Sequence, residues 1–375
     1  MKSILYLVTE DWYFWSHRKM LAEQTLIEGY KVIVATNPGN YTDKITAIGI
    51  EVVPISMARS VANPIKEISS ILQLVEINKK YKPDLVHNIS LKPILLGSIG
   101  AWIAGVPRVI NAYTGLGYIF ISSSWSSLIF RKIITPLLSL LFKREQFYSI
   151  VQNKDDETLL MDEGLVKTGK YSLIRGAGVD TSHFKYTPEV PTDTPIVMFA
   201  SRLLVDKGIR EFIEACKILR TRNTGASYVV VGDVDEGNPS SINKSELNSW
   251  LEDQLVEWWG HRDDMYNVIC SANVVCLPSY REGLPKTLLE AASVGRAIVT
   301  TDVPGCRDIV TNNINGLIVN AKDAISLADA MESLVCSPAS RIEMGKAGRT
   351  LVENKFDVNI INRRTIDLYN LMLNK

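Results

Sequence analysis

Short apolar segments alternate with longer segments of helical periodicity in the first half of the chain. The apolar segments are six or seven residues long and rich in β-branched side chains, which is typical of strands buried on both faces. Segments long enough for helices separate them, and this order predicts a parallel sheet covered by helices. The predicted strands are residues 4–9, 31–36, 50–56, 84–89 and 107–113, and the predicted helices are residues 16–29, 42–49 and 63–81, the last with Ile65, Ile68, Ile71, Leu72 and Val75 at helical spacing.

The alternation stops at residues 186–195, where three prolines and no periodicity predict a linker, and then restarts. The chain is therefore expected to form two doubly wound α/β domains, residues 1–186 and 187–356, with a last helix over 357–375 that packs back on the first. Ligands of such sheets bind at the carboxyl ends of the strands, so a site in a cleft between the domains is expected. The second domain has predicted strands at 195–201, 227–233, 256–260, 273–279 and 297–302.

Composition narrows the class of protein. The 375 residues carry 41 basic and 41 acidic side chains, a balance that argues against a nucleic-acid-binding protein. The five cysteines show no metal-ligand spacing and no signal peptide is evident, so reduced thiols in a cytoplasmic protein are expected. No uncharged apolar run reaches the length of a membrane span. Residues 118–145 come nearest, and either a buried helix or an interfacial helix with basic anchors fits them.

Charged residues follow two predicted strands of the second domain. Arg202 and Lys207 stand near a predicted helix start, where two cations and the helix dipole suit a diphosphate, although a solvated basic pair is the simpler interpretation. Glu282 and Glu290 bracket a Gly-Leu-Pro turn, where they could equally be ordinary charges at a helix start. As acceptor-only groups they suit neutral hydroxyls. Together these residues predict a nucleotide-sugar site.

Several segments resemble the large retaining glycosyltransferase family 4. They are "ASRLLVDKGIREFIEA", "VVVGD", "GHRDDM", "VVCLPSYREGLPKTLLEAASVGRAIVTTDVPGCRDIV", "NGLIV" and, between the domains, "RGAGVDTSHF". The family signature of two glutamates separated by seven residues fits Glu282 and Glu290. The resemblance covers nearly the whole chain, is most specific over 197–320, and implies the GT-B fold of two Rossmann-like domains.

The resemblance also implies roles for individual residues. Arg202 and Lys207 would bind the donor diphosphate, Glu282 the donor sugar and Glu290 the ribose. The backbone of Gly283, Leu284 and Pro285 would lie beside sugar and phosphate, and Arg262 near the base. Cations and helix dipoles would stabilise the leaving diphosphate, so no metal or other cofactor is expected. Retention in this family is usually explained by front-face attack, in which the leaving phosphate takes the proton of the acceptor.

The chain departs from the family pattern on the expected acceptor side. In place of a glycine-rich loop after the first strand it has "TEDWYFWSHRK", interpreted as a loop whose Trp15, His17 and Arg18 form an acceptor wall, with covering of the core as the alternative. Where many members have a histidine against the donor sugar, this chain has Tyr113-Thr114, so Thr114 is a further candidate. His87 is another, because it lies near a strand end, but a buried hydrogen-bonded histidine is slightly favoured.

A bacterial subgroup that elongates lipid-linked glycans has a similar Gly-Leu-Gly, "DEGNPSS" and "LPSYREGLP". This similarity favours a UDP-N-acetylhexosamine donor, a polyprenyl-diphosphate-linked acceptor and a peripheral position on the inner face of the bacterial membrane. Another nucleotide sugar or a soluble acceptor is the alternative. Three other classes were weighed: a metal-dependent transferase using Asp233 and Asp235, a dinucleotide oxidoreductase, for which no GxGxxG is found, and a non-catalytic scaffold, against which the charged set speaks.

Overall fold

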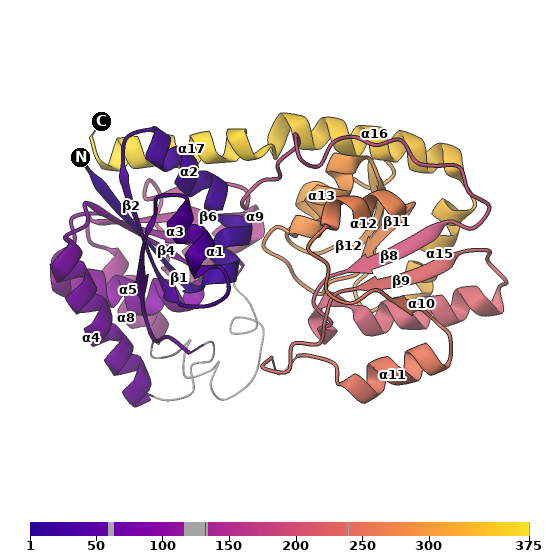
Figure 1. Ribbon diagram of the computed structural model, residues 1–375, viewed down its shortest axis with the longest axis horizontal. Coiled ribbons are helices and arrows are strands. Elements are labelled where there is room, and N and C mark those ends of the chain that lie inside the picture. Colours follow the sequence, from indigo (N-terminus) through magenta and orange to yellow (C-terminus); the bar gives the residue numbers. More distant parts are fainter. Residues whose placement is uncertain (59–63, 116–131, 133, 239, 375) are drawn as a thin grey trace. The chain divides into compact units, whose positions relative to one another are not determined.

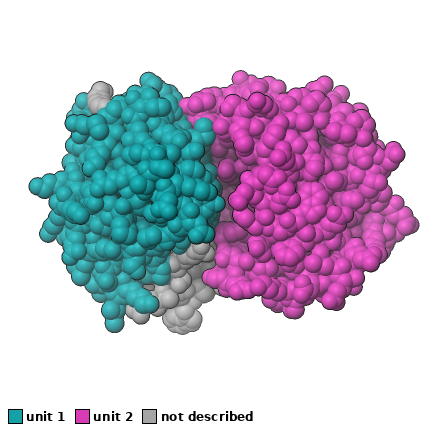
Figure 2. Space-filling view, in the orientation of Figure 1, with its two compact units in different colours: residues 1–177, 361–375 teal, residues 178–360 magenta. Residues whose placement is uncertain are grey.

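The computed structural model describes residues 1–58, 64–115, 132, 134–238 and 240–374. Within them the chain forms two compact units, residues 1–177 with 361–375 and residues 178–360 (Figure 1, Figure 2). Each unit contains one sheet in which all the described strand pairs are parallel. The predicted architecture of two doubly wound α/β domains is therefore confirmed.

The sheet of the first unit has the order β3-β2-β1-β4-β5-β6-β7. Its strands β4 and β5 are buried from end to end, because helices cover both faces. Helices α4, α5, α8 and α9 supply one core, and α1, α2, α3 and α17 supply the other (Figure 1). The strands are β1 Ser3–Glu10, β2 Lys31–Asn37, β3 Glu51–Pro54, β4 Leu85–Ile89, β5 Val109–Ala112, β6 Phe147–Val151 and β7 Tyr171–Leu173, and the helices are α1 Asp11–His17, α2 Lys19–Ile27, α3 Thr42–Ala47, α4 Pro64–Tyr81, α5 Leu91–Ala104, α8 Thr135–Phe142, α9 Lys154–Asp162 and α17 Val358–Met372.

The segment after β1 is a helix and not the predicted loop. Asp11, Phe14 and Arg18 are buried at helical spacing, which explains why α1 forms there. Asp11 also accepts hydrogen bonds from the backbone N–H of Tyr41 at 2.9 Å and from the hydroxyl of Thr42 at 3.1 Å. The first helical turn thus fixes the segment that follows β2.

Helix α4 presents a different face to the core from the one its sequence suggests. Val75 is buried, but Ile65, Ile68 and Leu72 are 78%, 59% and 59% exposed. The line of contact runs instead through Leu74, which packs so closely on α5 that a Cβ added at Gly100 would lie 2.9 Å from it. The packing partner, and not apolar spacing alone, sets the buried face.

The second unit has the sheet order β10-β9-β8-β11-β12-β13. Helices α10 and α15 pack on each other, and α13 packs with α12 and α16 on the other side of the sheet (Figure 1). The strands are β8 Ile196–Ala200, β9 Ser227–Val231, β10 Glu257–Trp258, β11 Val274–Leu277, β12 Ala297–Thr301 and β13 Gly316–Val319, and the helices are η2 Val205–Lys207, α10 Ile209–Thr221, α11 Lys244–Glu252, α12 Met265–Ser271, α13 Lys286–Val294, α14 Cys306–Ile309, α15 Ala324–Val335 and α16 Pro338–Lys355.

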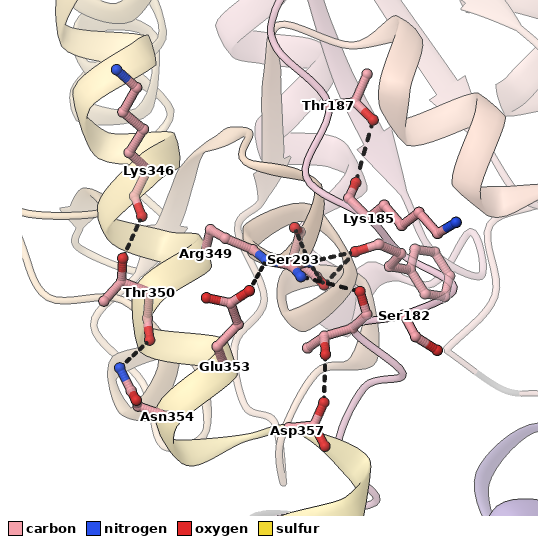
Figure 3. Close-up of polar contacts among 12 residues, drawn as sticks. Ser182, Lys185, Thr187, Ser293, Lys346, Arg349, Thr350, Glu353, Asn354 and Asp357 are labelled. Carbon is pink, nitrogen blue, oxygen red and sulfur yellow. Dashed lines mark hydrogen bonds and ion pairs between the residues drawn. The ribbon is translucent and has the colours of Figure 1, made fainter.

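The boundary between the units comes after Ala177, nine residues before the predicted one. The segment that follows belongs to the second unit because Arg349 of α16 donates to the carbonyls of Thr181 and Phe184, and the Ser293 hydroxyl donates to Phe184 as well (Figure 3). The proline-rich stretch 186–195 has no regular structure, but it lies wholly inside the second unit. At the end of the chain, residues 361–375, which include most of α17, belong to the first unit.

The apolar segment 118–145 is only partly visible. Residues 118–131 and 133 lie outside the described residues, and the rest includes α8, which buries Leu138 and Phe142 and exposes Leu137 and Leu140. In the part of the chain that the structure describes, no helix has both the length and the apolar character required to cross a bilayer.

Candidate functional site

The order of the second sheet creates a switch point between β8 and β11. From β8 the chain first adds β9 on one side and later adds β11 on the other. The loops leaving β8 and β11 therefore run in opposite directions and leave a crevice at the carboxyl end of the sheet, which is where doubly wound folds bind ligands. Arg202 and Lys207 follow β8, and Glu282 and Gly283 follow β11, so the predicted donor residues lie at this crevice.

Two glycines allow the loops around the crevice to touch. Gly208, the residue that precedes α10, has φ +76°, and a Cβ on it would lie 2.0 Å from the carbonyl oxygen of Pro278. Gly305, after β12, has φ +79°, and its Cβ would lie 2.6 Å from the carbonyl oxygen of Gly283. Any larger residue would force these loops apart. The backbone of Tyr280 also donates to Asp206 at 2.9 Å, which joins the β8 and β11 loops directly.

Lys207 and Glu282 form an ion pair across the switch point. The Lys207 Nζ lies 2.5 Å from Glu282 Oε1, and the two side chains are only 17% and 10% exposed. The hydroxyl of Ser279 donates to the same carboxylate oxygen at 2.8 Å. A cation and an acceptor are thus held at the N-termini of α10 and α13, where the helix dipoles favour an anion.

Arg202 is paired with a carboxylate as well. Its Nη1 donates to Asp235 Oδ2 at 2.9 Å. The backbone N–H of Asp235 donates to Ser241 Oγ at 3.0 Å. The β9–α11 loop also exchanges backbone hydrogen bonds with residues 203–205. From the sequence Asp235 is a candidate metal ligand, but in the structure its carboxylate orients the Arg202 guanidinium. Arg202 remains half-exposed, so the rest of its planar fork can meet a phosphate.

Glu290 lies one turn into α13 and is 5% exposed. Lys286 Nζ lies 3.3 Å from its carboxylate. Burial raises the pKa of Glu290, while the charges of Lys286 and His183 oppose that shift. His183 was not predicted, although it lies in the quoted "RGAGVDTSHF" segment, which the network around Arg349 holds in the second unit (Figure 3).

The remaining predicted donor residues lie in two places. Gly283 and Pro285 are buried in the turn before α13, and Leu284 between them is half-buried. Arg262, beyond β10, makes a bidentate pair with Asp264 at 2.8 Å through both Nε and Nη2. The described contacts of Arg262 therefore give it a local structural role, and its predicted contact with the base stays a prediction.

Three of the predicted acceptor residues lie at least partly at the surface of the first unit. The Trp15 ring is 6.1 Å from that of Tyr41, and His17 stacks on Tyr13 at 4.3 Å. The Thr114 hydroxyl donates to Ser90 Oγ at 3.1 Å, after β5 and β4. Their position at the carboxyl end of the first sheet leaves the predicted acceptor role open to test.

His87 and Arg18 do not lie where an acceptor could reach them directly. His87 is 1% exposed, and its Nδ1 lies 2.6 Å from the Tyr369 hydroxyl. That hydroxyl donates to Tyr6, so we infer that His87 carries its proton on Nδ1. Burial lowers the pKa of His87 well below its usual value, and the charge of Arg18 acts in the same direction. His87 is therefore the buried, hydrogen-bonded histidine that the sequence slightly favours over an acceptor residue, and Arg18 is likewise buried, with 6% of its surface exposed.

Models of known families match both units. The model described as "Glycosyl transferase 4-like" matches residues 3–148, and the model described as "Glycosyl transferases group 1" matches residues 194–337. The second match includes Arg202, Lys207, Glu282 and Glu290, so it covers the whole candidate site.

Two curated relatives align over most of their length. The chain is 28% identical over 356 residues to the N,N'-diacetylbacillosaminyl-diphospho-undecaprenol alpha-1,3-N-acetylgalactosaminyltransferase of Campylobacter jejuni, covering 92% of each chain. It is 28% identical over 329 residues to the UDP-Gal:alpha-D-GlcNAc-diphosphoundecaprenol alpha-1,3-galactosyltransferase of Escherichia coli, covering 83% of this chain and 81% of that one.

Solved structures share the fold over nearly the full length. A glycosyltransferase from Rickettsia africae matches with a TM-score of 0.79 and 21% identity, covering 99% of this chain and 98% of that one. Anabaena Alr3699/HepE, solved with UDP and glucose, matches with a TM-score of 0.80 and 16% identity, covering 99% of this chain and 100% of that one. At such identities the likeness concerns the fold.

Proposed function

The chain belongs to glycosyltransferase family 4 and has the GT-B fold, and from this premise we propose that it transfers an N-acetylhexosamine from a UDP-sugar to a polyprenyl-diphosphate-linked acceptor, with retention at the anomeric carbon. The observation that carries the proposal is the set of cations and carboxylates at the β8–β11 switch point. Arg202 and Lys207 supply positive charge. Glu282, whose carboxylate is paired with Lys207, supplies oxygens that accept hydrogen bonds from hydroxyl groups.

In the reaction, the bond between the anomeric carbon and the diphosphate oxygen breaks as negative charge grows on the diphosphate. Lys207, Arg202 and the N-terminal ends of α10 and α13 stabilise that charge, because they are fixed in place before the bond breaks. The acceptor hydroxyl forms the new bond on the same face of the sugar and gives its proton to the leaving diphosphate. No enzymic nucleophile is needed, and no divalent metal is required in this scheme.

Glu282 and Glu290 bind the neutral parts of the donor. Glu282, held by Lys207 and the Ser279 hydroxyl, accepts from hydroxyls of the transferred sugar. Glu290 accepts from the ribose, and its ionised form is the stronger acceptor for this purpose. Two carboxylates that flank the Gly-Leu-Pro turn place sugar and ribose on either side of the diphosphate, which is the shape of a UDP-sugar.

The acceptor class is supported by the two relatives, whose names place a diphospho-undecaprenol sugar as the substrate of each. We therefore propose a role in bacterial surface-glycan assembly, such as O-antigen or capsule, at the inner face of the cell membrane. The N-acetylhexosamine donor is favoured by the Campylobacter relative, whereas the Escherichia coli relative uses UDP-Gal, so a hexose is the alternative donor.

The test is a panel of nucleotide sugars, scored by release of nucleoside diphosphate with and without polyprenyl-diphosphate-linked sugars. We expect turnover with a UDP-N-acetylhexosamine, dependence on the lipid-linked acceptor, activity in EDTA, and an α-linked product from an α-linked donor by NMR. Glu282→Ala and Arg202→Ala should each lower kcat about 100-fold or more.

A matched control tests whether the site or general stability is responsible. Arg210 lies in the first turn of α10, three residues after Lys207, but its side chain is half-exposed and pairs with Glu246 at 2.7 Å. Arg210→Ala should keep near-full turnover. Near-full turnover of both site variants would refute the site assignment. If no donor gave any nucleoside diphosphate, the proposed transferase activity would be refuted.

A further inference from the structure

Tyr280, in the segment between β11 and α13, makes contacts that the proposed mechanism does not use. Its hydroxyl donates to Glu211 Oε1 at 2.7 Å, and its backbone N–H donates to the Asp206 carbonyl at 2.9 Å. Lys322, which follows β13, places its Nζ 4.8 Å from the centre of the tyrosine ring. One residue of this segment therefore meets the loop after β8, the first turn of α10 and the loop after β13.

The two hydrogen bonds of Tyr280 bracket Lys207 in the chain. Asp206 directly precedes Lys207, and Glu211 follows it by four residues, in the first turn of α10. Tyr280 itself lies two residues before Glu282. Both members of the Lys207–Glu282 pair are therefore attached, within a few residues, to the junction that Tyr280 forms.

The carboxylate of Glu211 is committed to this junction. In the part of the chain that the structure describes, only the Tyr280 hydroxyl donates a hydrogen bond to it, and its Oε2 is buried without a partner. An acidic side chain in the first turn of a helix is stabilised by the helix dipole. Because hydrogen bonds to an ionised acceptor are stronger than bonds between neutral groups, the Tyr280–Glu211 bond is a firm link between the two loops.

The proposed mechanism requires such a link. As the sugar is transferred, Lys207 turns to the leaving diphosphate and Glu282 to the sugar hydroxyls, so the ion pair that joins the two loops must open. The close approach of Gly208 to the Pro278 carbonyl limits how near the loops can come, but it contains no hydrogen bond that fixes their register. The bonds of Tyr280 involve neither member of the pair, and they persist when the pair opens.

We propose that Tyr280 is a positioning residue, whose hydrogen bond to Glu211 keeps the loops after β8 and β11 in register while the Lys207–Glu282 pair is open. It acts through Lys207 and Glu282 and not on the substrate. It holds the cation and the carboxylate at the spacing that one donor molecule needs, and small displacements of such groups lower the rate steeply. This inference rests on the proposed function, because the pair opens only for a donor that carries both a diphosphate and a sugar.

The experiment removes the bond from either side. Tyr280→Phe deletes the hydroxyl but keeps the ring, and with it the contact to Lys322. Glu211→Met deletes the acceptor, whereas Glu211→Gln keeps an oxygen that can accept from Tyr280. Tyr228→Phe is the matched control, because the Tyr228 hydroxyl is buried in the same unit but has no hydrogen-bond partner among the described residues.

Turnover is measured with a UDP-N-acetylhexosamine and a polyprenyl-diphosphate-linked sugar, and the affinity for UDP is measured by calorimetry. Tyr280→Phe and Glu211→Met should each lower kcat about tenfold, as expected for one hydrogen bond to a charged acceptor, and change the KM for the donor by no more than about twofold. The variant with both substitutions should lose no more than either alone, because both remove the same bond. Glu211→Gln should stay within about threefold of the wild-type kcat.

The affinity for UDP should not change in any variant, because UDP carries no sugar and leaves Glu282 paired with Lys207. This separates a positioning role from general damage to the donor site, which would weaken UDP binding in step with kcat and overturn the proposal. Tyr228→Phe should keep the wild-type kcat.

A wild-type kcat in Tyr280→Phe, or an equal loss in Tyr228→Phe, would overturn the proposal. Additive losses of kcat in the variant with both substitutions would show that Tyr280 and Glu211 act separately, and would overturn it as well. These outcomes leave the transferase activity of the wild-type protein intact. If the wild-type protein transfers no sugar from any donor, the proposed function fails and this inference falls with it.

Discussion

The pair of Lys207 and Glu282 allows stability and catalysis to be separated by substitution. Each side chain is less than one-fifth exposed, so removing one partner leaves the other charge in a poorly solvated place. Breaking a fully buried pair costs about 3–5 kcal/mol. With the remaining exposure discounted, we expect Lys207→Met to destabilise the second unit by about 2–3 kcal/mol.

Glu282→Gln should cost less, about 1–2 kcal/mol, because the amide oxygen still accepts from Lys207 and from the Ser279 hydroxyl. In the double variant neither residue is charged, so no unpaired charge remains. The double variant should lose about as much free energy of unfolding as Lys207→Met alone. The difference from the sum of the two single losses is the coupling energy, about 1–2 kcal/mol. The free energy of opening is measured by native-state hydrogen exchange of amides in β8 and β11.

Turnover should show no such compensation in the double variant. In the proposed mechanism Lys207 stabilises the leaving diphosphate and Glu282 binds the sugar, so each single variant should lose about 100-fold or more in kcat and the double variant should recover none of it. The exposed pair of Arg210 and Glu246 is the control, with about 0.2–1 kcal/mol of coupling and no effect on turnover. Additive stability losses at Lys207 and Glu282, or restored turnover in the double variant, would refute the reasoning.

Three further predictions concern single residues. Burial raises the pKa of Glu290 above its unfolded value of about 4.5, so its contribution to stability is present below that value and is lost as pH rises through the folded pKa. Glu290→Gln should therefore become more stable relative to wild type as the pH is raised from about 4 to about 8. A difference in the hydrogen-exchange free energy that does not change with pH would contradict this. Asp235→Asn should weaken the orientation of Arg202 and lower kcat about 3- to 30-fold while donor binding, measured by calorimetry, changes less; a change confined to binding would count against a positioning role. Thiol titration of the native protein should label the exposed Cys336 fastest and leave Cys306 unreacted, since burial raises the pKa of the Cys306 thiol to about 12. Rapid labelling of Cys306 would show that this thiol is accessible and would contradict the prediction.

The fold was predictable because its signals are local and repeated. Apolar runs such as those of β8 and β11 are buried in the sheet, so their sequence has no polar alternation to confuse the assignment. The proximity of the candidate donor residues was predictable because they follow strands and precede helices, and the topology of a doubly wound sheet brings such loops to one edge. Nothing more than the order of elements is needed to place Lys207 near Glu282.

Other features depend on which partner a segment meets, and the sequence does not contain that information locally. The aromatic run after β1 predicts a loop, since four aromatic residues in succession hide the helical spacing of Asp11, Phe14 and Arg18, but it forms α1. His87 lies on a strand of the right kind, but its neighbour is Tyr369, 282 residues away. The unit boundary differs from the predicted one by nine residues for the same reason, because Arg349 binds a segment more than 160 residues earlier in the chain.

In the candidate donor site each of three cations is already paired with a carboxylate. Arg202 is paired with Asp235, Lys207 with Glu282 and Lys286 with Glu290, so the local charge is nearly balanced. A diphosphate must compete with these carboxylates, which lowers ground-state affinity. The same pairs keep the cations from adopting other rotamers, so little reorganisation remains when charge develops on the leaving group. If Glu282 turns to the sugar hydroxyls as the diphosphate takes Lys207, the exchange couples recognition of the sugar to activation of its leaving group. A nucleoside diphosphate without a sugar offers Glu282 no such hydroxyls, and it should therefore gain less from Lys207 than the intact donor does.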